Sequence, residues 1–350
     1  MPKGEVIMGK KYFDFVIGNP PYQDETTGEQ KNYSPQIYNL FMNESYKVGK
    51  KVELIHPARF LFNAGGTPKA WNHKMLNDPH FKVLYYEQKS GNIFANTDIK
   101  GGIAVTYRDE SQDFEPIGTF TIYEELNSIK NKVISDAGMS LRTIISNRGL
   151  YRFSKLIYKE NPKEMERFSD SRISSSAFDR LPEEFFYDRP NDGKEYIEIF
   201  GRTSTGREYR WIRKDYVKDI ENLYKFKVVL PKSNGTGALG EILSTPVVLN
   251  PMTGYTETFI GIGSFNNIAE ANSLLKYIKT KFVRVLLGIL KITQDNTSEK
   301  WEFVPLQDFT PNSDINWSKS IHEIDPQLYR KYGLDEKEIN FIETHVKEME

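Results

Sequence analysis

As far as Glu110, the chain alternates between two hydrophobic patterns. Short apolar runs predict strands, and between them apolar residues recur every three or four positions, as in helices that bury one face. Strands that alternate with helices predict an α/β sheet. The expected strands cover residues 12–18, 52–55, 81–86 and 103–107, and the expected helices cover 35–49 and 69–76.

The first strand, with the sequence YFDFVIG, ends at Gly18 and is followed closely by two prolines. An apolar run of this kind is typical of a parallel strand that is buried on both faces. We therefore expect residues 12–18 to lie inside the sheet.

The pattern changes after residue 115. Helical segments at 123–135, 141–147 and 153–158 lead into a region rich in Gly, Thr and aromatic residues. Residues 269–290 predict a long helix or a helix pair, and short amphipathic helices follow from residue 316. We divide the chain into an α/β part (1–115), an α+β part (116–310) and a short helical tail (311–350).

The composition restricts the possible chemistry. The chain has 350 residues, of which 27% are charged and 13% aromatic, and its formal net charge is −1. It contains no cysteine, which excludes disulfide scaffolds, cysteine-ligated zinc or iron–sulfur sites, and reactions that need a thiol nucleophile. The five histidines have no paired ligand spacing, so we expect no metal site.

No segment of the sequence predicts secretion or membrane insertion. The N-terminal residues, MPKGEVIMGKKYFDF, lack the apolar core of a signal peptide. The most apolar stretch, Phe282–Leu290, contains Arg284 and is far shorter than the ~20 residues that a membrane helix needs. We therefore expect a cytoplasmic protein with no membrane partner.

Asn19, Pro20, Pro21 and Tyr22 directly follow the first strand. Open α/β sheets bind ligands at the carboxyl ends of their strands. The two prolines lack an N–H and stiffen the turn, so its carbonyl oxygens remain available as acceptors. The Asn19 side-chain oxygen and the Pro20 carbonyl can together accept both hydrogens of an exocyclic amino group.

Such a loop suits an adenine that is swung out of its duplex, with the Tyr22 ring as a stacking surface. Accepting both amino hydrogens would make the amino nitrogen more nucleophilic, and no side-chain nucleophile is required. The alternative interpretation is a stiff turn that closes a strand, with Tyr22 as a packing residue.

The sequence FDFVIGNPPY resembles motif IV of the N6-adenine DNA methyltransferases of restriction–modification systems, in the gamma-type order. Residues 37–63 resemble the helix–strand segment that follows the catalytic loop in this family. Residues 92–107 resemble the segment whose aromatic residue packs on the flipped adenine, and by that match the residue is Phe94. From Arg202 onward the chain resembles a target-recognition region.

The resemblance implies a partial Rossmann-like methyltransferase sheet, followed by an α+β target-recognition domain. It implies site-specific adenine-N6 methylation of double-stranded DNA, with catalysis at Asn19–Tyr22 and base stacking by Tyr22 and Phe94. The cofactor would be S-adenosylmethionine.

The family binds this cofactor through a Gly-rich strand–loop–helix, which in gamma-type order precedes the NPPY loop. Here the loop begins at Asn19, which leaves too short a segment before it for those elements. The sequence FIGIGSF at 259–265 is a weak alternative, because it lacks the third glycine and the preceding acidic residue. We therefore expect the chain to be a fragment or split subunit, inactive by itself, with the cofactor half on a second polypeptide.

A local excess of positive charge lies between Gly201 and Gly240, where nine Lys/Arg face four acidic residues. Tyr and Trp are interleaved, and a flexible Gly-rich loop follows. The stretch predicts DNA contact, although a solvated basic face is the alternative for any single residue. The candidate DNA-binding residues are Arg202, Arg207, Arg210, Lys232 and Asn234.

Two other functions remain open. Asp78, followed by a strand and by Glu87 and Lys89, loosely resembles a metal-dependent nuclease site. The chain could also be a DNA-recognition or regulatory module that keeps the NPPY loop but has no catalysis of its own.

Overall fold

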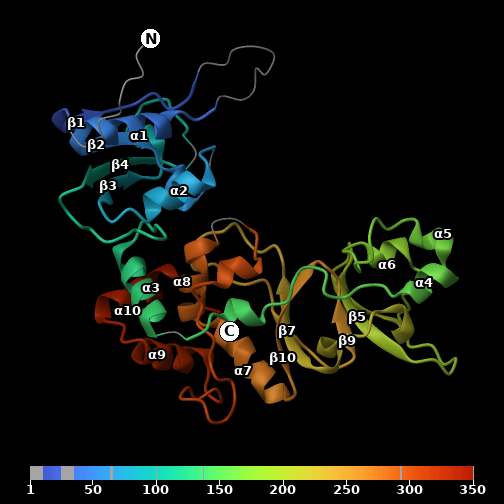
Figure 1. Cartoon of the computed structure of the whole chain (residues 1–350). Coiled ribbons are helices and arrows are strands. Elements are labelled where there is room, and N and C mark those ends of the chain that lie inside the picture. The colour runs from blue at the N-terminus through green and yellow to red at the C-terminus, as the bar shows by residue number, and fades with distance from the viewer. Residues whose placement is uncertain are drawn as a thin grey trace. The chain divides into compact units, whose positions relative to one another are not determined.

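The computed structural model describes residues 11–24, 35–63, 66–99, 101–136, 138–291 and 294–349. The chain divides into two units, Met1–Ile122 and Tyr123–Glu350. Among the described residues, the first unit has a four-stranded sheet with two α-helices, and the second is a larger mixture of helices and two three-stranded sheets (Figure 1). The predicted α/β class is therefore confirmed at this coarse level.

The first unit has the strand order β1-β2-β4-β3. β1 and β2 are parallel, as the sequence predicts, whereas β2 with β4 and β4 with β3 are antiparallel. The elements are β1 (Phe13–Gly18), α1 (Tyr38–Val48), β2 (Gly49–Pro57), α2 (Lys69–Leu76), β3 (Phe81–Glu87) and β4 (Ile103–Asp109).

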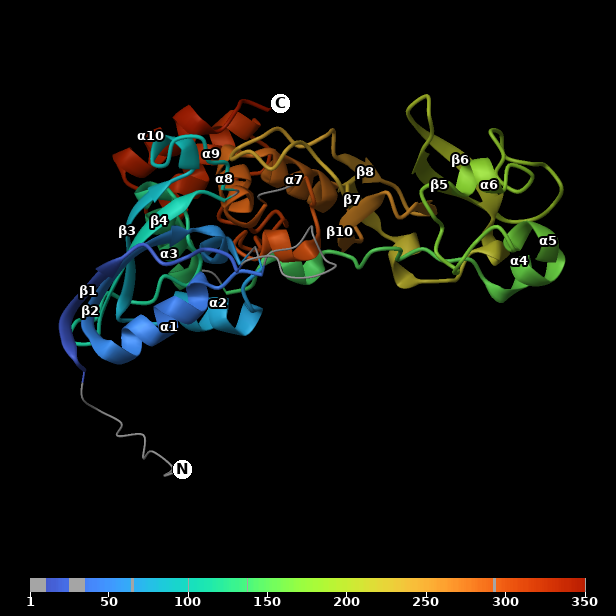
Figure 2. The same ribbon diagram turned by 90° about the horizontal axis from the view of Figure 1, so that it is seen from above.

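Both helices of the first unit pack on the same face of its sheet (Figure 2). Strand residues on that face alternate with residues on the other face, as the period of two requires. Val52 and Leu54 of β2 meet Tyr38 and Met42 of α1 in this core. The remaining buried members are Ala58, Phe60, Leu61, Trp71, Met75, Leu76, Phe81 and Ala104.

The prediction that the first strand is buried on both faces is wrong, because the face of β1 opposite the helices is exposed. Phe13, Phe15 and Ile17 are 57%, 64% and 77% exposed, so β1 is not buried on both faces. β1 is also an edge strand, because β2 is the one strand that pairs with it among the described residues. An edge strand with large exposed apolar side chains is typical of an interaction surface.

The second unit contains the sheets β10-β7-β8 and β6-β5-β9. Its strands are β5 (Tyr196–Arg202), β6 (Arg207–Arg213), β7 (Phe226–Pro231), β8 (Val247–Leu249), β9 (Thr253–Tyr255) and β10 (Phe259–Phe265). Its helices are α3 (Glu124–Asp136), α4 (Lys155–Glu160), α5 (Pro162–Met165), α6 (Ala177–Arg180), α7 (Ile268–Lys279), α8 (Lys281–Leu290), α9 (Ile321–Lys331) and α10 (Glu336–His345).

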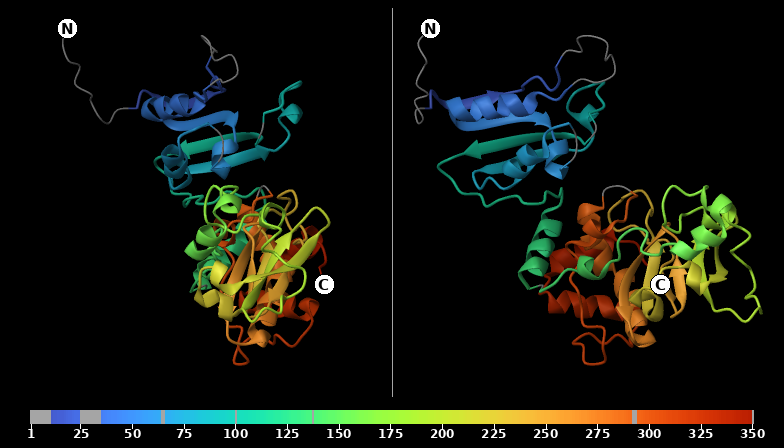
Figure 3. Two further views of the ribbon diagram at one scale, coloured as in Figure 1. Left: turned by 90° about the vertical axis from the view of Figure 1, so that its right-hand side faces the viewer. Right: turned by 45° about the vertical axis from the view of Figure 1, so that its right-hand side comes forward.

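Two hydrophobic clusters hold the second unit together. One joins α3 and α7–α10, so the residues of the expected tail share a core with the helices before them. The other joins α4–α6 to β5 and β6, at the far end of the same unit (Figure 3). β7 links the clusters, because Val228 and Leu230 face the first and Val229 faces the second.

The expected helix or helix pair at 269–290 is a pair, α7 and α8, separated at Thr280. The Thr280 hydroxyl accepts the N–H of Val283, and the Asp325 carboxylate from α9 accepts the N–H groups of Lys281 and Phe282 at 3.0 and 2.9 Å. These acceptors satisfy the free N–H groups at the start of α8. The expected helix at 141–147 is instead a 3₁₀ helix over Leu141–Ile144.

Candidate functional site

The Asn19–Tyr22 loop lies at the carboxyl end of β1, beside the parallel strand β2. Asn19 and Pro21 are exposed, and Tyr22 is half-buried. The Tyr22 carbonyl accepts the N–H of Ile37 at 3.1 Å, which ties the loop to the start of α1. The loop is thus fixed at both ends, while its first side chain faces solvent.

Tyr22 and Phe94 come together although they lie far apart in the sequence. Their ring centroids are 6.5 Å apart and their planes meet at 61°, an edge-to-face contact. Phe94 is held by a tight turn in which its N–H donates to Ser90 at 2.8 Å and its carbonyl accepts the Thr97 hydroxyl at 2.7 Å. No base fits between rings in this geometry, so stacking would require Tyr22 or Phe94 to rotate.

The Tyr22 hydroxyl points into the protein. Its oxygen is buried and makes no hydrogen bond of standard geometry within the described residues. Burial raises the pKa of the Tyr22 phenol above 10, and the nearby Asn19 side chain opposes this shift. Burial is costly for a polar oxygen that makes no hydrogen bond of standard geometry, so a rotation of Tyr22 that exposes the hydroxyl would recover hydration.

A pocket of about 240 Å³ lies beside Tyr22. It is smaller than the ~300–1,000 Å³ of sites for drug-sized ligands, so it suits a small ring system better than a whole nucleotide. Its walls mix amide, charged and apolar groups. The lining residues are Tyr22, Gln23, Gln36, Pro57, Arg59, Asp98 and Ile99.

His56 directly precedes Pro57 at the end of β2, and Pro57 lines this pocket. Its ring is fully buried, stacks on Tyr38 at 5.6 Å and contacts the Thr106 hydroxyl through Nε2 at 2.7 Å. Burial lowers the pKa of His56 from 6.5 to about 4, so the ring is neutral near pH 7. The sequence shows this histidine at the strand end but gives no sign of its burial.

The candidate nuclease residues lie apart. Asp78 precedes β3 and pairs with Arg108 at 2.7 Å, whereas Glu87 ends the same strand and accepts the N–H of Lys89. A strand of this length spans roughly 20 Å, so the two carboxylates cannot share a metal ion. No cluster of three or more candidate ligands occurs among the described residues. The nuclease hypothesis for these residues is therefore wrong.

The structure separates the candidate DNA-binding residues into two groups. Arg202 is exposed and pairs in register with Arg207 across β5 and β6. Burial and then the adjacent Arg202 charge lower the pKa of Arg207, which identifies two neighbouring positive charges. Arg207 also donates to the Ser244 carbonyl at 2.8 Å, and Lys232 is half-buried.

Arg210 and Asn234 have inward positions that correct our expectation of direct DNA contact. Arg210 is 7% exposed, pairs with Glu208 at 2.9 Å and lies over the Tyr187 ring. Asn234 is 3% exposed, donates to the Ile242 carbonyl at 3.1 Å and accepts the N–H of Ser244. Both side chains are occupied in holding the protein together.

A buried ion pair between Lys291 and Glu241 holds the Gly-rich loop at 233–240 in place. The Lys291 ammonium is 2% exposed and contacts the Glu241 carboxylate and the Asn234 carbonyl, the latter at 2.7 Å. The same carboxylate accepts the N–H groups of Thr236 and Gly237 at 2.8 and 3.2 Å. The loop that the sequence predicts as flexible is therefore held by a charged anchor.

The alternative cofactor sequence FIGIGSF is strand β10. It pairs with β7, and its first five residues are buried. A Cβ on Gly261 would lie 2.3 Å from the Tyr255 hydroxyl, so this glycine serves close packing. It is therefore not a loop that opens a helix.

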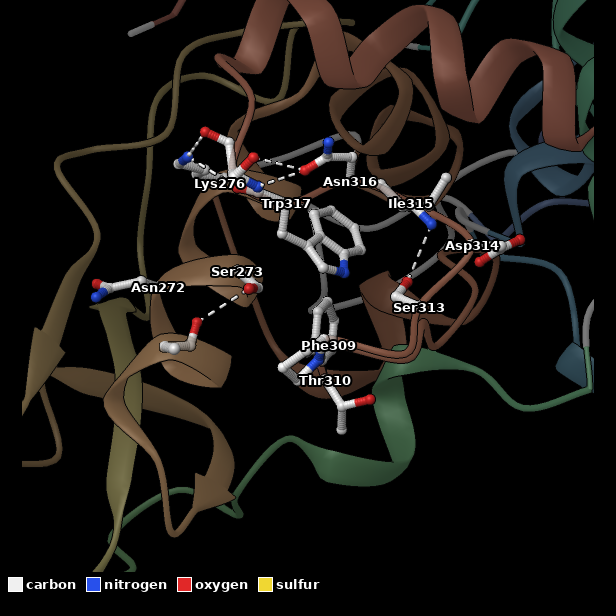
Figure 4. Close-up of a pocket in the computed structure, with 13 residues that line it drawn as sticks. Asn272, Ser273, Lys276, Phe309, Thr310, Ser313, Asp314, Ile315, Asn316 and Trp317 are labelled. Atoms are coloured by element: carbon white, nitrogen blue, oxygen red, sulfur yellow. Dashed lines mark hydrogen bonds between the residues drawn. The ribbon is translucent and has the colours of Figure 1, made fainter.

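A larger pocket, of about 720 Å³, lies between α7 and residues 309–318 (Figure 4). Phe309 and Trp317 form its aromatic wall, with ring centroids 5.5 Å apart. The Lys276 ammonium at its rim donates to the carbonyls of Trp317 and Lys319 at 2.9 and 2.8 Å. These carbonyls occupy the Lys276 cation, and Asp314, a carboxylate of the same lining, pairs with Lys331 at 2.9 Å.

No helix in the described part of the chain is long and apolar enough to cross a membrane.

Residues 3–94 match the family described as Eco57I restriction-modification methylase. This stretch contains the NPPY loop and ends at Phe94, and the match connects it with restriction–modification methylation. No curated protein matches the chain in sequence.

Two of the solved structures that resemble the chain illustrate how weak the similarity is. The type IIG restriction endonuclease BpuSI has a TM-score of 0.34 and 11% identity, over 89% of this chain and 48% of the other. The type IIL restriction-modification enzyme MmeI, solved in complex with DNA, has a TM-score of 0.37 and 9% identity, over 95% of this chain and 56% of the other. The chain thus spans about half the length of these proteins.

Proposed function

We propose that this chain carries the catalytic loop and the target-recognition part of a site-specific DNA adenine-N6 methyltransferase in a restriction–modification system. One observation carries the proposal. The Asn19–Tyr22 loop lies at the carboxyl end of a parallel strand, within the stretch that matches the methylase family, and it brings Tyr22 against Phe94. In this proposal the first unit is part of a Rossmann-like methyltransferase sheet.

The loop would act by holding the amino group of a flipped adenine. The exposed Asn19 side-chain oxygen and the Pro20 carbonyl accept one amino hydrogen each, which concentrates electron density on the nitrogen. Tyr22 and Phe94 would exchange their edge-to-face contact for stacking on the base.

The second unit would bind double-stranded DNA. Arg202, Arg207 and Lys232 support this role, because they combine positive charge with at least partial exposure. Phosphate contacts of this kind would position the duplex, whereas base contacts would define the recognition sequence.

The reaction needs S-adenosylmethionine as methyl donor, and the described residues do not fit this cofactor. The candidate Gly-rich sequence, residues 259–265, forms the buried strand β10 and supplies no loop between a strand and a helix. We propose that a second polypeptide supplies the site for this cofactor. The open edge of β1, with Phe15 and Ile17 exposed, supports such a partner.

The same lack of a cofactor loop in the described residues favours a second candidate function. Without a partner, the chain would be a DNA-recognition or regulatory module that has no catalysis of its own.

The test uses the native complex, isolated through an affinity tag on this chain, with labelled S-adenosylmethionine and unmethylated duplex DNA. Asn19→Ala should reduce the methylation rate by roughly 10²–10³-fold, as the loss of a preorganised polar group does. Tyr22→Ala should weaken capture of the base by about 1–3 kcal/mol, whereas Tyr22→Phe should retain most activity. Asn77→Ala, which removes an exposed amide elsewhere in the first unit, is the control.

The outcomes separate the two functions. Labelled N6-methyladenine that depends on Asn19 supports catalysis. An Asn19→Ala complex that methylates at the parental rate contradicts it. DNA binding without any methyl transfer would favour the regulatory module.

A further inference from the structure

Two arginines from distant segments of the second unit meet at one carboxylate. Arg148 Nη2 and Arg172 Nη1 each lie 3.2 Å from Glu257 Oε2, just before β10 begins. Arg148 follows the 3₁₀ helix Leu141–Ile144, and Arg172 lies between α5 and α6. The sequence gives no sign of this cluster, because its three members lie far apart along the chain.

Arg172 is fixed firmly in this position. Its Nε donates to Asp170 Oδ2 at 2.9 Å, and the next residue, Ile173, accepts the N–H of Glu257 at 2.9 Å. Arg172 holds the pKa of Asp170 at about 2, so this carboxylate stays ionised at any ordinary pH. Gly149 has a φ of +65°, and a Cβ there would lie 2.5 Å from Arg172 Cδ. Glycine at this position therefore leaves room for the Arg172 side chain in its present conformation.

Arg148 is the more exposed of the two arginines. Its side chain is 53% exposed, and in the part of the chain that the structure describes Glu257 is its one acidic partner. A guanidinium has five N–H donors in a planar fork that matches an oxyanion. The contact with Glu257 engages one end of that fork, so the other donors face solvent.

The surroundings favour an anion of the DNA backbone. Arg148, Arg152 and Arg172 face the two carboxylates of Asp170 and Glu257, an excess of one positive charge. The cluster also continues into the proposed DNA interface. The Lys232 N–H donates to the Thr258 carbonyl at 2.9 Å, and the Arg207 guanidinium lies 5.8 Å from the Phe259 ring centroid.

We propose that Arg148 and Arg172 form a clamp for one backbone phosphate of double-stranded DNA. Glu257 holds the two guanidiniums side by side, and Arg148 makes the principal contact. The clamp rests on the proposed function, because it assumes that the second unit binds DNA. It contributes to affinity equally on all sequences, since a phosphate carries no base information.

The test measures duplex binding by fluorescence anisotropy from 50 to 200 mM KCl. Arg148→Gln should flatten the log–log salt dependence by about 0.9, the value of one phosphate contact. The ratio of the parental affinity for DNA to the Arg148→Gln affinity should therefore fall about 3.5-fold from 50 to 200 mM KCl. The fall should be the same on duplexes of unrelated sequence. Arg148→Lys should keep the slope, because it keeps the charge.

Arg142→Gln is the matched control. Arg142 lies six residues earlier, is 47% exposed and pairs with a single carboxylate, Glu302, away from the clamp. Equal slopes for Arg148→Gln and Arg142→Gln, with both variants folded by thermal melting, would overturn the clamp. If the parental chain binds no duplex, the DNA-binding part of the proposed function fails and the clamp fails with it.

Discussion

The buried His56 makes the first unit sensitive to mild acid. Its pKa is about 4 in the folded protein, against 6.5 for an ordinary histidine, because burial disfavours the charged ring. Below pH 6.5 the unfolded chain therefore binds a proton that the folded chain cannot hold. The folded state is therefore most stable, as far as His56 is concerned, above pH 6.5, and it loses this stability as the pH falls towards 4.

The magnitude follows from the size of the shift. At 1.36 kcal/mol per pKa unit, the full loss between pH 6.5 and pH 4 is about 3 kcal/mol. Between pH 6.5 and pH 5 it is about 1.5–2 kcal/mol, and ordinary carboxyl groups with pKa values near 4 contribute little in that window. A typical domain has only ~5–15 kcal/mol of stability, so the loss is readily measured.

The assay is hydrogen exchange of β2 and β4 peptides in urea, at pH values from 7 to 5 and corrected for intrinsic exchange. The unfolding free energy of these strands should fall with the pH in the parental chain and in His73→Gln, which replaces an exposed histidine of the same unit. His56→Gln should start lower and show a flat profile. A parental profile as flat as that of His56→Gln would refute the reasoning.

Two further predictions concern the charged anchor and the open strand. Glu241→Gln removes the carboxylate charge that contacts the Lys291 ammonium, which is 2% exposed, and should lower the unfolding free energy of the second unit by about 3–5 kcal/mol in urea titrations. Lys291→Met should cost less, because Glu241 keeps its backbone N–H donors, and an equal cost would contradict the anchor role. Replacing both Phe15 and Ile17 with Ser should change the unfolding free energy by less than about 1 kcal/mol, because both are exposed, yet abolish co-purification of the second polypeptide that we propose. Unchanged co-purification would show that β1 is not the docking strand.

The sequence predicts the strands and helices of the first unit well, because their hydrophobic periods are local signals. It also predicts that β1 and β2 are parallel, since a helix connects them. It cannot show which face of β1 is covered. Phe15 and Ile17 have the composition of core residues, and their exposure depends on elements elsewhere in the fold.

The basic stretch shows the limit of counting charges. In β6 the side chains alternate between faces, and Arg210 shares its face with Ile212, which is fully buried. A period of two applied to this strand would have separated Arg210 from Arg207. For Asn234 no local signal exists, because its partners Ile242 and Ser244 reach it through a loop whose path the sequence does not specify.

The contact between Tyr22 and Phe94 bears on how the proposed site could admit a base. An edge-to-face aromatic pair is worth about 0.5–1.5 kcal/mol, whereas stacking on a nucleic-acid base is worth about 1–3 kcal/mol. Exchanging one contact for the other is therefore favourable or neutral. The cost of admitting adenine would then lie in the duplex, where the base must be unstacked and unpaired. In that case the phosphate contacts of the second unit, rather than any strain in the loop, would have to supply the free energy for extrusion.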